Sequence, residues 1–160
     1  MGKGYHIGRL GAVVLVLGGL GCAAGTGCRE EATGPPRAML SGRGGQVVTV
    51  AVEVVRRPHA LRQGLMYRDR LAAAGGMLFV YPAEDQRSFW MKNTYIPLDI
   101  VFIGDNRRIV GIVRDAQPLT TTPRRVDAPS RFVLEVNAGF TRRHGVRTGS
   151  RVRFENVPGL

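Results

Sequence analysis

The sequence predicts an α+β domain, built on a mainly antiparallel, strongly bent β-sheet that is barrel-like in form and carries two short helices. Three observations support this fold class. Segments in which apolar and polar residues alternate, typical of half-buried strands, recur between residues 46 and 154. A continuous apolar run at residues 77–81 is typical of a central strand. The turn-forming residues 104–106 join two strand segments at hairpin spacing.

Residues 1–21 have the form of a signal peptide. Lys3 and Arg9 give the first segment a positive charge, and residues 10–20 are apolar or glycine throughout. This apolar stretch fits the roughly 7–15 residues of a signal-peptide core. It is shorter than the roughly 20 residues that a membrane-spanning helix needs. We therefore expect an exported protein.

Two cysteines follow this leader and are candidates for lipid attachment. Gly19-Leu20-Gly21-Cys22 resembles a bacterial lipobox, in which the cysteine is acylated and becomes the first mature residue. Cys28 is a second, weaker candidate. A third alternative is that neither cysteine is lipidated. By similarity to lipoproteins, Ala23 rather than aspartate after Cys22 points to the outer membrane. We expect a periplasmic or outer-membrane-anchored lipoprotein.

Residues 22–45 are rich in Gly, Pro, Ala and Ser and have no hydrophobic period, which is typical of a flexible tether. Residues 46–160 are then predicted to form a single folded domain. The chain offers no evidence on oligomeric state, so a monomer is assumed.

The elements of the folded domain follow from its local patterns. Strands are expected where apolar residues alternate or run together, and helices where they recur at i, i+4 and i+5 or where glycine ends a short segment. A polar loop of about 16 residues is expected at 115–130, and loops of that length are usually functional or mobile. The predicted strands are 46–55, 77–81, 89–91, 98–103, 108–114, 131–136 and 151–154, and the predicted helices run from Pro58 to about Arg68 and from about Ala138 to His144.

The stretch from Ser88 to Ile100 concentrates residues with chemical capacity. It contains Trp90, the only tryptophan of the chain, and Lys92, the only lysine after the leader. Asn93, Thr94 and Asp99 add further polar groups between two segments that are predicted to be buried strands. This stretch is therefore the main candidate for a functional site.

Several short motifs occur in order along the folded part. They are Gly64-Leu65-Met66, Gly76-Met77-Leu78-Phe79-Val80, Trp90-Met91-Lys92-Asn93-Thr94, Ile96-Pro97-Leu98-Asp99 and Val133-Leu134-Glu135-Val136-Asn137-Ala138-Gly139. Together they resemble the uncharacterised ancient conserved region family, which is domain-of-unknown-function family 192. The resemblance covers about residues 48–154, nearly all of the folded part, and implies a compact, mainly β domain with no established activity.

The polar residues of these motifs allow two interpretations. Asp99 and Glu135 lie in predicted strands among apolar neighbours, where a carboxylate is costly unless it is paired or functional. Lys92 could form a buried ion pair with one of them, and a Lys92–Asp99 pair is narrowly preferred. Alternatively the three residues converge in a cleft with Trp90 as a stacking wall. The candidate ligand-binding or structural cluster is Trp90, Lys92, Asn93, Thr94, Asp99, Glu135 and Asn137.

Composition narrows the chemistry further. Both cysteines precede the folded part, and only His59 and His144 remain there, so neither a metal site nor a cofactor is expected. The net charge is +11, but the arginines are scattered and no nucleic-acid motif accompanies them, so we expect no nucleic-acid partner. Anionic lipid or acidic polysaccharide fits an exported basic protein better.

The sequence does not define the protein's function. The preferred interpretation is a noncatalytic, membrane-tethered envelope domain that binds a small molecule, a polysaccharide or an envelope protein. The competing interpretation is an enzyme that uses Asp99 or Glu135 as general acid or base, with Lys92 as its electrostatic partner. We favour the noncatalytic interpretation, and no catalytic residue is assigned.

Overall fold

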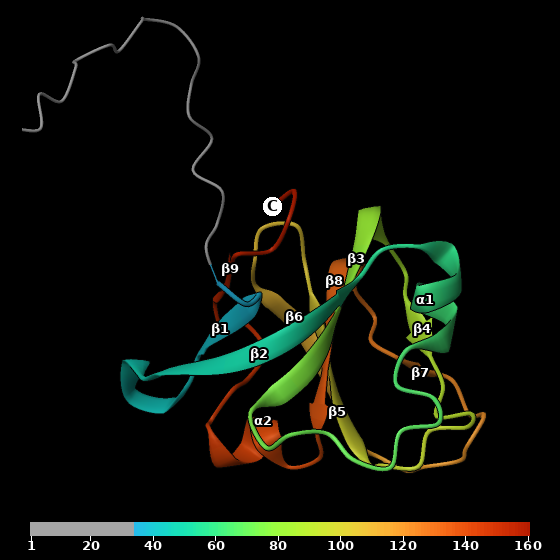
Figure 1. The fold of residues 1–160 in the computed structure, drawn as a ribbon. Helices are drawn as coiled ribbons and strands as arrows, with labels where there is room; N and C mark the ends of the chain where they lie inside the picture. Colours follow the sequence, from blue (N-terminus) through green and yellow to red (C-terminus); the bar gives the residue numbers. More distant parts are fainter. Residues whose placement is uncertain (1–33) are drawn as a thin grey trace, which may run out of the picture. The chain divides into compact units, whose positions relative to one another are not determined.

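The computed structural model of the protein describes residues 34–160 (Figure 1). The predicted signal peptide and the two candidate lipidation sites, Cys22 and Cys28, lie outside the described residues. Within residues 34–160, a seven-stranded sheet and a two-stranded ribbon carry two short α-helices. The elements are β1 (Arg37–Ser41), a 3-10 helix (Arg43–Gly45), β2 (Val47–Val55), α1 (Pro58–Gln63), β3 (Gly75–Asp85), β4 (Ser88–Phe89), β5 (Leu98–Ile103), β6 (Ile109–Ala116), β7 (Arg124–Arg125), β8 (Ser130–Asn137), α2 (Phe140–Arg143) and β9 (Val152–Glu155).

The large sheet is mixed rather than purely antiparallel. Its strand order is β6-β5-β8-β3-β2-β1-β9, and neighbouring strands are antiparallel except for β2 and β3, which run parallel. Parallel neighbours require a crossover, and α1 with the loop that follows it provides one. The prediction of a mainly strand-built domain with two short helices is thus confirmed. The parallel pairing of β2 with β3 is the correction to the predicted antiparallel sheet.

The sheet curls into a half-barrel whose two edge strands come together at one end (Figure 1). Arg108, just before β6, forms an antiparallel bridge with Arg151, just before β9. The Ile109 N–H donates to the Ser150 carbonyl at 3.0 Å, and the Val152 N–H donates to the Arg107 carbonyl at 2.8 Å. These bonds pair backbone groups that an open sheet edge would leave exposed.

Both faces of the central strands are buried. One face packs within the curl around residues such as Leu78, Val101 and Leu134. The other carries Phe79 and Ile100 and is covered by side chains of α1, of the loop after it and of the segment before β8. All six residues of β5 are buried for this reason.

The domain begins earlier in the chain than the sequence predicted. Residues 37–45 were assigned to the tether, but β1 pairs with both β2 and β9, and Ala38 and Leu40 are fully buried. A strand of five residues with Gly- and Pro-rich neighbours is too short for its alternation to stand out in the sequence. The predicted tether therefore extends too far at its C-terminal end.

Two further segments differ from the prediction. Helix α1 ends at Gln63 rather than near Arg68, because Gly64 follows with a positive φ of 52°. The predicted surface loop at 115–130 contains β7, which pairs with β4. This loop packs tightly onto β6. A Cβ atom on Gly111 of β6 would lie only 2.5 Å from Cγ1 of Val126 in the loop.

Candidate functional site

A pocket of about 510 Å³ opens on the outer face of the sheet, beside α1 and β4. Residues from α1, β3, β4, β8 and the segment before β7 contribute to it, so its walls come from distant parts of the sequence. Most of the lining side chains are apolar or aromatic. The lining residues are Pro58, Leu61, Arg62, Gln63, Gly64, Leu65, Met66, Phe79, Tyr81, Ser88, Phe89, Trp90, Thr94, Thr121, Pro123 and Glu135.

Within the part of the chain that the structure describes, Glu135 is the only acidic residue of this lining. It lies in β8, where its register neighbours are Met77 of β3 and Ile100 of β5, both apolar. Only 4% of the residue is exposed, and its Oε2 atom has no hydrogen-bond partner among residues 34–160. Burial away from water raises the pKa of the Glu135 carboxyl from 4.5 to about 8, so this group is mainly protonated at neutral pH.

Aromatic side chains form much of the wall around Glu135. Phe79 and Phe89 meet edge to face with ring centroids 5.0 Å apart. The guanidinium carbon of Arg87 lies 4.0 Å from the centroid of the Tyr81 ring. Burial raises the pKa of the Tyr81 phenol. Trp90 is 49% exposed and therefore lies at the edge of the pocket rather than in the core.

Gly64 brings the end of α1 close to the buried acid. Its positive φ favours glycine, and the space beside it is also restricted. A Cβ atom at this position would lie 3.1 Å from the Phe79 ring and 3.8 Å from Oε2 of Glu135. Gly64-Leu65-Met66 is one of the motifs that carry the family resemblance, and the structure places all three residues in the pocket wall.

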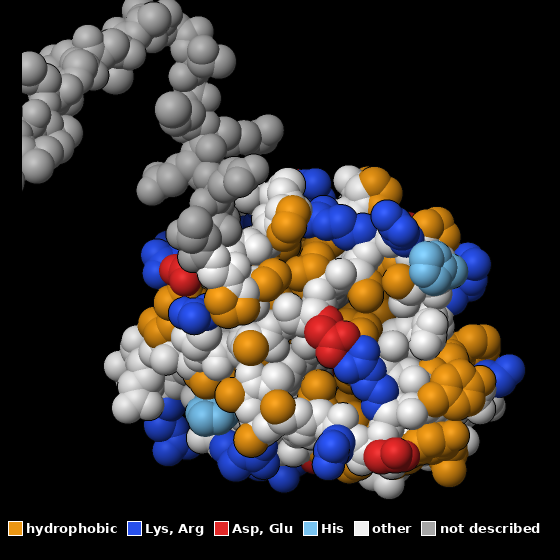
Figure 2. All heavy atoms as spheres, in the orientation of Figure 1, with side chains coloured by type: hydrophobic (Ala, Val, Ile, Leu, Met, Phe, Trp, Pro, Cys, Tyr) orange, Lys and Arg blue, Asp and Glu red, His pale blue; other side chains and the backbone are white. Residues whose placement is uncertain are grey.

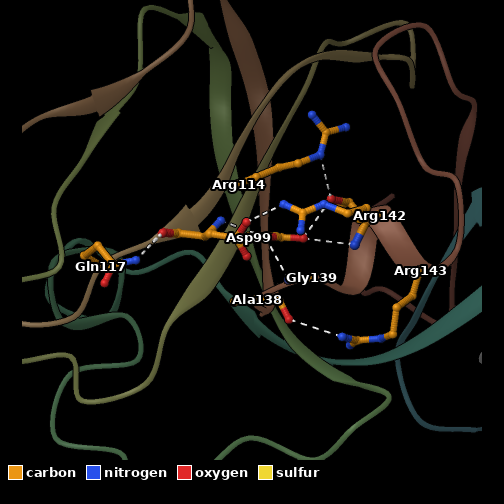
Figure 3. A network of polar contacts seen from close by, with 9 residues as sticks. Asp99, Arg114, Gln117, Ala138, Gly139, Arg142 and Arg143 are labelled. Carbon is orange, nitrogen blue, oxygen red and sulfur yellow. Dashed lines mark hydrogen bonds and ion pairs between the residues drawn. The ribbon is translucent and has the colours of Figure 1, made fainter.

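Asp99 is fully buried too, but its carboxylate is saturated with hydrogen bonds (Figure 3). Its Oδ1 atom accepts from the backbone N–H groups of Asp115 and Gly139 at 3.0 and 3.2 Å. Its Oδ2 atom accepts from the backbone N–H and the hydroxyl of Thr141 at 2.9 and 2.7 Å. Asp99 thus ties the start of α2 and the end of β6 to β5, which is a structural role.

Asp99 and Glu135 do not converge. In the β5–β8 register Asp99 lies opposite Val136 and Glu135 lies opposite Ile100, so the two carboxyl groups point to opposite faces of the sheet. Lys92 is exposed, and within residues 34–160 it takes part in no salt bridge. The preferred Lys92–Asp99 pair is therefore wrong, because backbone and hydroxyl donors occupy the Asp99 oxygens.

The remaining predicted residues divide between the pocket and its supports. Thr94 is buried and lines the pocket with Trp90 and Glu135, whereas Lys92 lies outside, with Nζ 5.6 Å from the centroid of the Trp90 ring. Asn93 has a positive φ of 55° and donates to the Tyr67 hydroxyl at 2.7 Å. Asn137 donates to the carbonyls of Leu71 and Ala72, which fastens the loop before β3.

Sequence reasoning missed several pocket residues, namely Phe79, Tyr81, Phe89, Thr121 and Pro123. Phe79 and Tyr81 alternate along one strand, which places them on a common face, but only the pairing of β3 with β8 shows that Glu135 shares that face. Thr121 and Pro123 belong to the predicted loop, and two hydrogen bonds hold that loop beside the Trp90 segment. The Met91 N–H donates to the Thr120 carbonyl at 2.9 Å, and the Leu119 N–H donates to the Thr94 carbonyl at 3.1 Å.

The described part of the chain contains neither a metal-binding cluster of side chains nor a membrane-spanning helix. Between residues 34 and 160, no cluster of three or more His, Cys, Asp and Glu side chains is arranged to hold a metal ion. In the same range, no helix has both the length and the apolar character needed to cross a bilayer.

The fold and the site define a small mixed-sheet domain with an apolar pocket around one buried acid. The chain belongs to the family described as Uncharacterized ACR, domain-of-unknown-function family 192, whose profile matches residues 39–154. The resemblance seen in the sequence motifs is thereby confirmed. Among curated proteins, none matches the chain.

The solved structures that are similar to this chain include the following two. One is described as a "putative transcription regulator" from Sinorhizobium meliloti 1021, with 36% identity, a TM-score of 0.73, and coverage of 76% of this chain and 95% of that one. The other is a protein of unknown function from Novosphingobium aromaticivorans DSM 12444, with 36% identity and a TM-score of 0.70. That comparison covers 73% of this chain and 83% of the other.

Proposed function

We propose that this chain is a noncatalytic, membrane-tethered envelope domain that binds a small molecule in the pocket around Glu135. The observation that carries the proposal is the unpartnered Oε2 atom of Glu135, buried in the wall of an apolar pocket. A buried carboxyl without a partner is costly for folding, and a bound ligand would supply the missing hydrogen bond. The pocket volume of about 510 Å³ lies within the range of small-molecule sites, roughly 300–1,000 Å³.

An enzymatic role is the alternative, and the raised pKa of Glu135 supports it, since a carboxyl that titrates near neutral pH can act as general acid or base. The neighbourhood of Glu135 favours binding instead. Among the described residues, its pocket lining contains no second acid and no histidine, lysine or cysteine. Asp99, the other candidate acid, lies on the opposite face with both oxygens occupied.

Ligand retention tests the binding proposal. The protein purified from its source should carry a small molecule that native mass spectrometry detects. Thr121→Phe adds a ring at an exposed position of the pocket wall and should remove this ligand. Thr122→Phe, at the neighbouring exposed position outside the lining, is the matched control and should keep it. Equal ligand content in both variants would place the ligand elsewhere, and a ligand-free wild-type protein would count against the proposal.

The membrane tether rests on the sequence alone and has its own test. Mass analysis of the mature protein should find an N-terminus at acylated Cys22, and Cys22→Ser should move the protein from the membrane fraction to the soluble fraction. Cys28→Ser is the control and should leave it membrane-bound. A protein that retains Met1 in the cytoplasm would contradict the proposal.

A further inference from the structure

We infer that the ligand of this pocket presents an uncharged hydrogen-bond acceptor, such as a carbonyl or ether oxygen, to Glu135, and that the pocket discriminates against an ammonium group at that position. This inference rests on the proposed function, because it names the ligand chemistry of the same pocket. It follows from the charges around the pocket, from the burial of Glu135 and from the aromatic walls.

The basic groups around the pocket outnumber the acidic ones. Among the described residues, Arg62, exposed on α1, is the only basic residue in the lining. Arg87 lies against the ring of Tyr81 and also forms an ion pair with exposed Asp85, and Lys92 lies near the ring of Trp90. Within residues 34–160, Glu135 is the single acid of the lining. Because burial raises the pKa of Glu135, an approaching ammonium would meet like charges and a carboxyl that is mainly uncharged at neutral pH.

Desolvation also favours an uncharged acceptor. An ammonium bound to Glu135 would require both groups to be charged and removed from water, and the cost of such a pair can exceed its Coulomb attraction. A carbonyl or ether oxygen needs no charge on either side. The protonated carboxyl of Glu135 donates one hydrogen bond, and no charge enters the pocket. The flat rings of Phe79, Phe89 and Trp90 would then contact an apolar or aromatic ligand body.

Burial, rather than a neighbouring charge, determines the protonation state of the Glu135 carboxyl. Met77 and Ile100 on the flanking strands are apolar, Tyr81 comes from β3, and Arg62 comes from α1. Asp99 lies on the other face of the sheet. Since burial raises the Glu135 pKa to about 8, the carboxyl is a donor below that pH and loses its proton above it. Binding of an acceptor should therefore weaken as the pH rises past about 8.

Two size-matched probes separate the possible ligand chemistries. Acetophenone carries an aromatic ring and a carbonyl acceptor, and 2-phenylethylamine carries the same ring and a cationic amine. Binding to the full chain can be followed by the aromatic NMR resonances of Trp90, which is the only tryptophan and lines the pocket. We expect acetophenone to bind more tightly than the amine at pH 6. Its apparent Kd should rise about tenfold between pH 6 and pH 9, as one pH unit above the pKa predicts.

Variants at position 135 test whether donation by this residue is the cause. Glu135→Gln keeps a donor without an ionisable group, so acetophenone binding should be retained within about twofold and become independent of pH. Glu135→Leu removes the donor and should weaken acetophenone binding about tenfold. Asp127→Asn makes the same acid-to-amide change at an exposed residue outside the lining, and it should leave both the affinity and the pH dependence unchanged. The Trp90 resonances of each variant also report whether it is folded.

Several results would overturn the inference. The first is tighter binding of 2-phenylethylamine than of acetophenone, lost in Glu135→Gln, which would show an ionised Glu135 that pairs with a cation. The second is acetophenone binding that responds neither to pH nor to the residue at 135. The third is no binding of either probe. None of these results decides the proposed function, which is tested separately by the native ligand and its loss in Thr121→Phe.

Discussion

Asp99 and Glu135 are two buried carboxyl groups on adjacent, paired strands, and their surroundings are opposite. Asp99 accepts four hydrogen bonds from the groups around it. Glu135 has an oxygen that finds no hydrogen-bond partner in the described part of the chain, and it lines a pocket. Burial of an acid therefore does not by itself indicate function. The supply of donors distinguishes a carboxylate that holds the fold together from one that is free to meet a ligand.

The largest expected effect is at Asp99. Asp99→Asn replaces one accepting oxygen with an amide that faces donors, so hydrogen bonds to Thr141 or to the Asp115 and Gly139 N–H groups are lost in the core. We expect the free energy of unfolding to fall by about 3–5 kcal/mol. Asp115→Asn is the matched control, because Asp115 forms an exposed ion pair with Arg142, and it should cost under about 1 kcal/mol. Equal losses in urea melts would contradict the structural role of Asp99.

Glu135 should respond in the opposite direction. Its folded pKa of about 8 is above the ordinary value of 4.5, so between these pH values the folded state holds a proton that the unfolded state has released. Raising the pH through this window therefore destabilises the wild-type protein, by at most about 1.4 kcal/mol per pH unit, and the loss is complete above about pH 8. Glu135→Gln has no ionisable group at this position, so its stability does not fall in this window. The stability of Glu135→Gln minus that of wild type should therefore be about 2–3 kcal/mol larger at pH 7 than at pH 4.

Urea melts of both proteins at pH 4, 7 and 9 measure this difference. A stability gap that does not change with pH would show that the Glu135 carboxyl titrates normally. A gap of opposite sign would mean that an unseen partner stabilises the carboxylate.

Trp90 is expected to have a smaller effect on stability. A fully buried tryptophan costs about 3–5 kcal/mol when replaced by alanine. Since Trp90 is 49% exposed, Trp90→Ala should cost about 1–2 kcal/mol and affect ligand retention more than stability. Thermal melts and native mass spectrometry of the same sample compare the two effects. A loss of 3 kcal/mol or more would assign the ring to the core.

Lys92 should have the smallest effect. If Lys92 formed a buried ion pair, Lys92→Met would cost about 3–5 kcal/mol. With Lys92 exposed and Asp99 occupied by other donors, the change should stay within about 0.5 kcal/mol. The double variant Lys92→Met, Asp99→Asn should then match Asp99→Asn alone, because the two residues do not interact. Recovery of stability in the double variant would show that Lys92 and Asp99 do interact.

The sequence predicted the fold class because it depends on local patterns. The alternation in β2 and the apolar run of β3 predict strands without any tertiary information. The parallel pairing of β2 with β3 could not be predicted, because strand direction depends on where the short crossover returns the chain. β1 was missed because its burial depends on pairing with β9 at the far end of the sequence.

The candidate site was predicted only in part for a similar reason. Trp90, Thr94 and Glu135 were singled out and lie together in the pocket. Asp99 was grouped with Glu135 because both acids interrupt apolar strands. Only the register, which pairs Asp99 with Val136 and Glu135 with Ile100, shows that they occupy opposite faces. The donors that satisfy Asp99 are mostly backbone N–H groups, which leave no residue-type signal in a sequence.

The most direct test is the titration of the Glu135 side chain itself. The carboxyl ¹³C resonance of Glu135, assigned by its loss in Glu135→Gln, should change with a midpoint near pH 8, because burial away from water disfavours the ionised form. A midpoint near 4.5 would mean that the carboxylate is solvated or paired. That result would contradict the account of Glu135 as the unsatisfied acid of a ligand pocket.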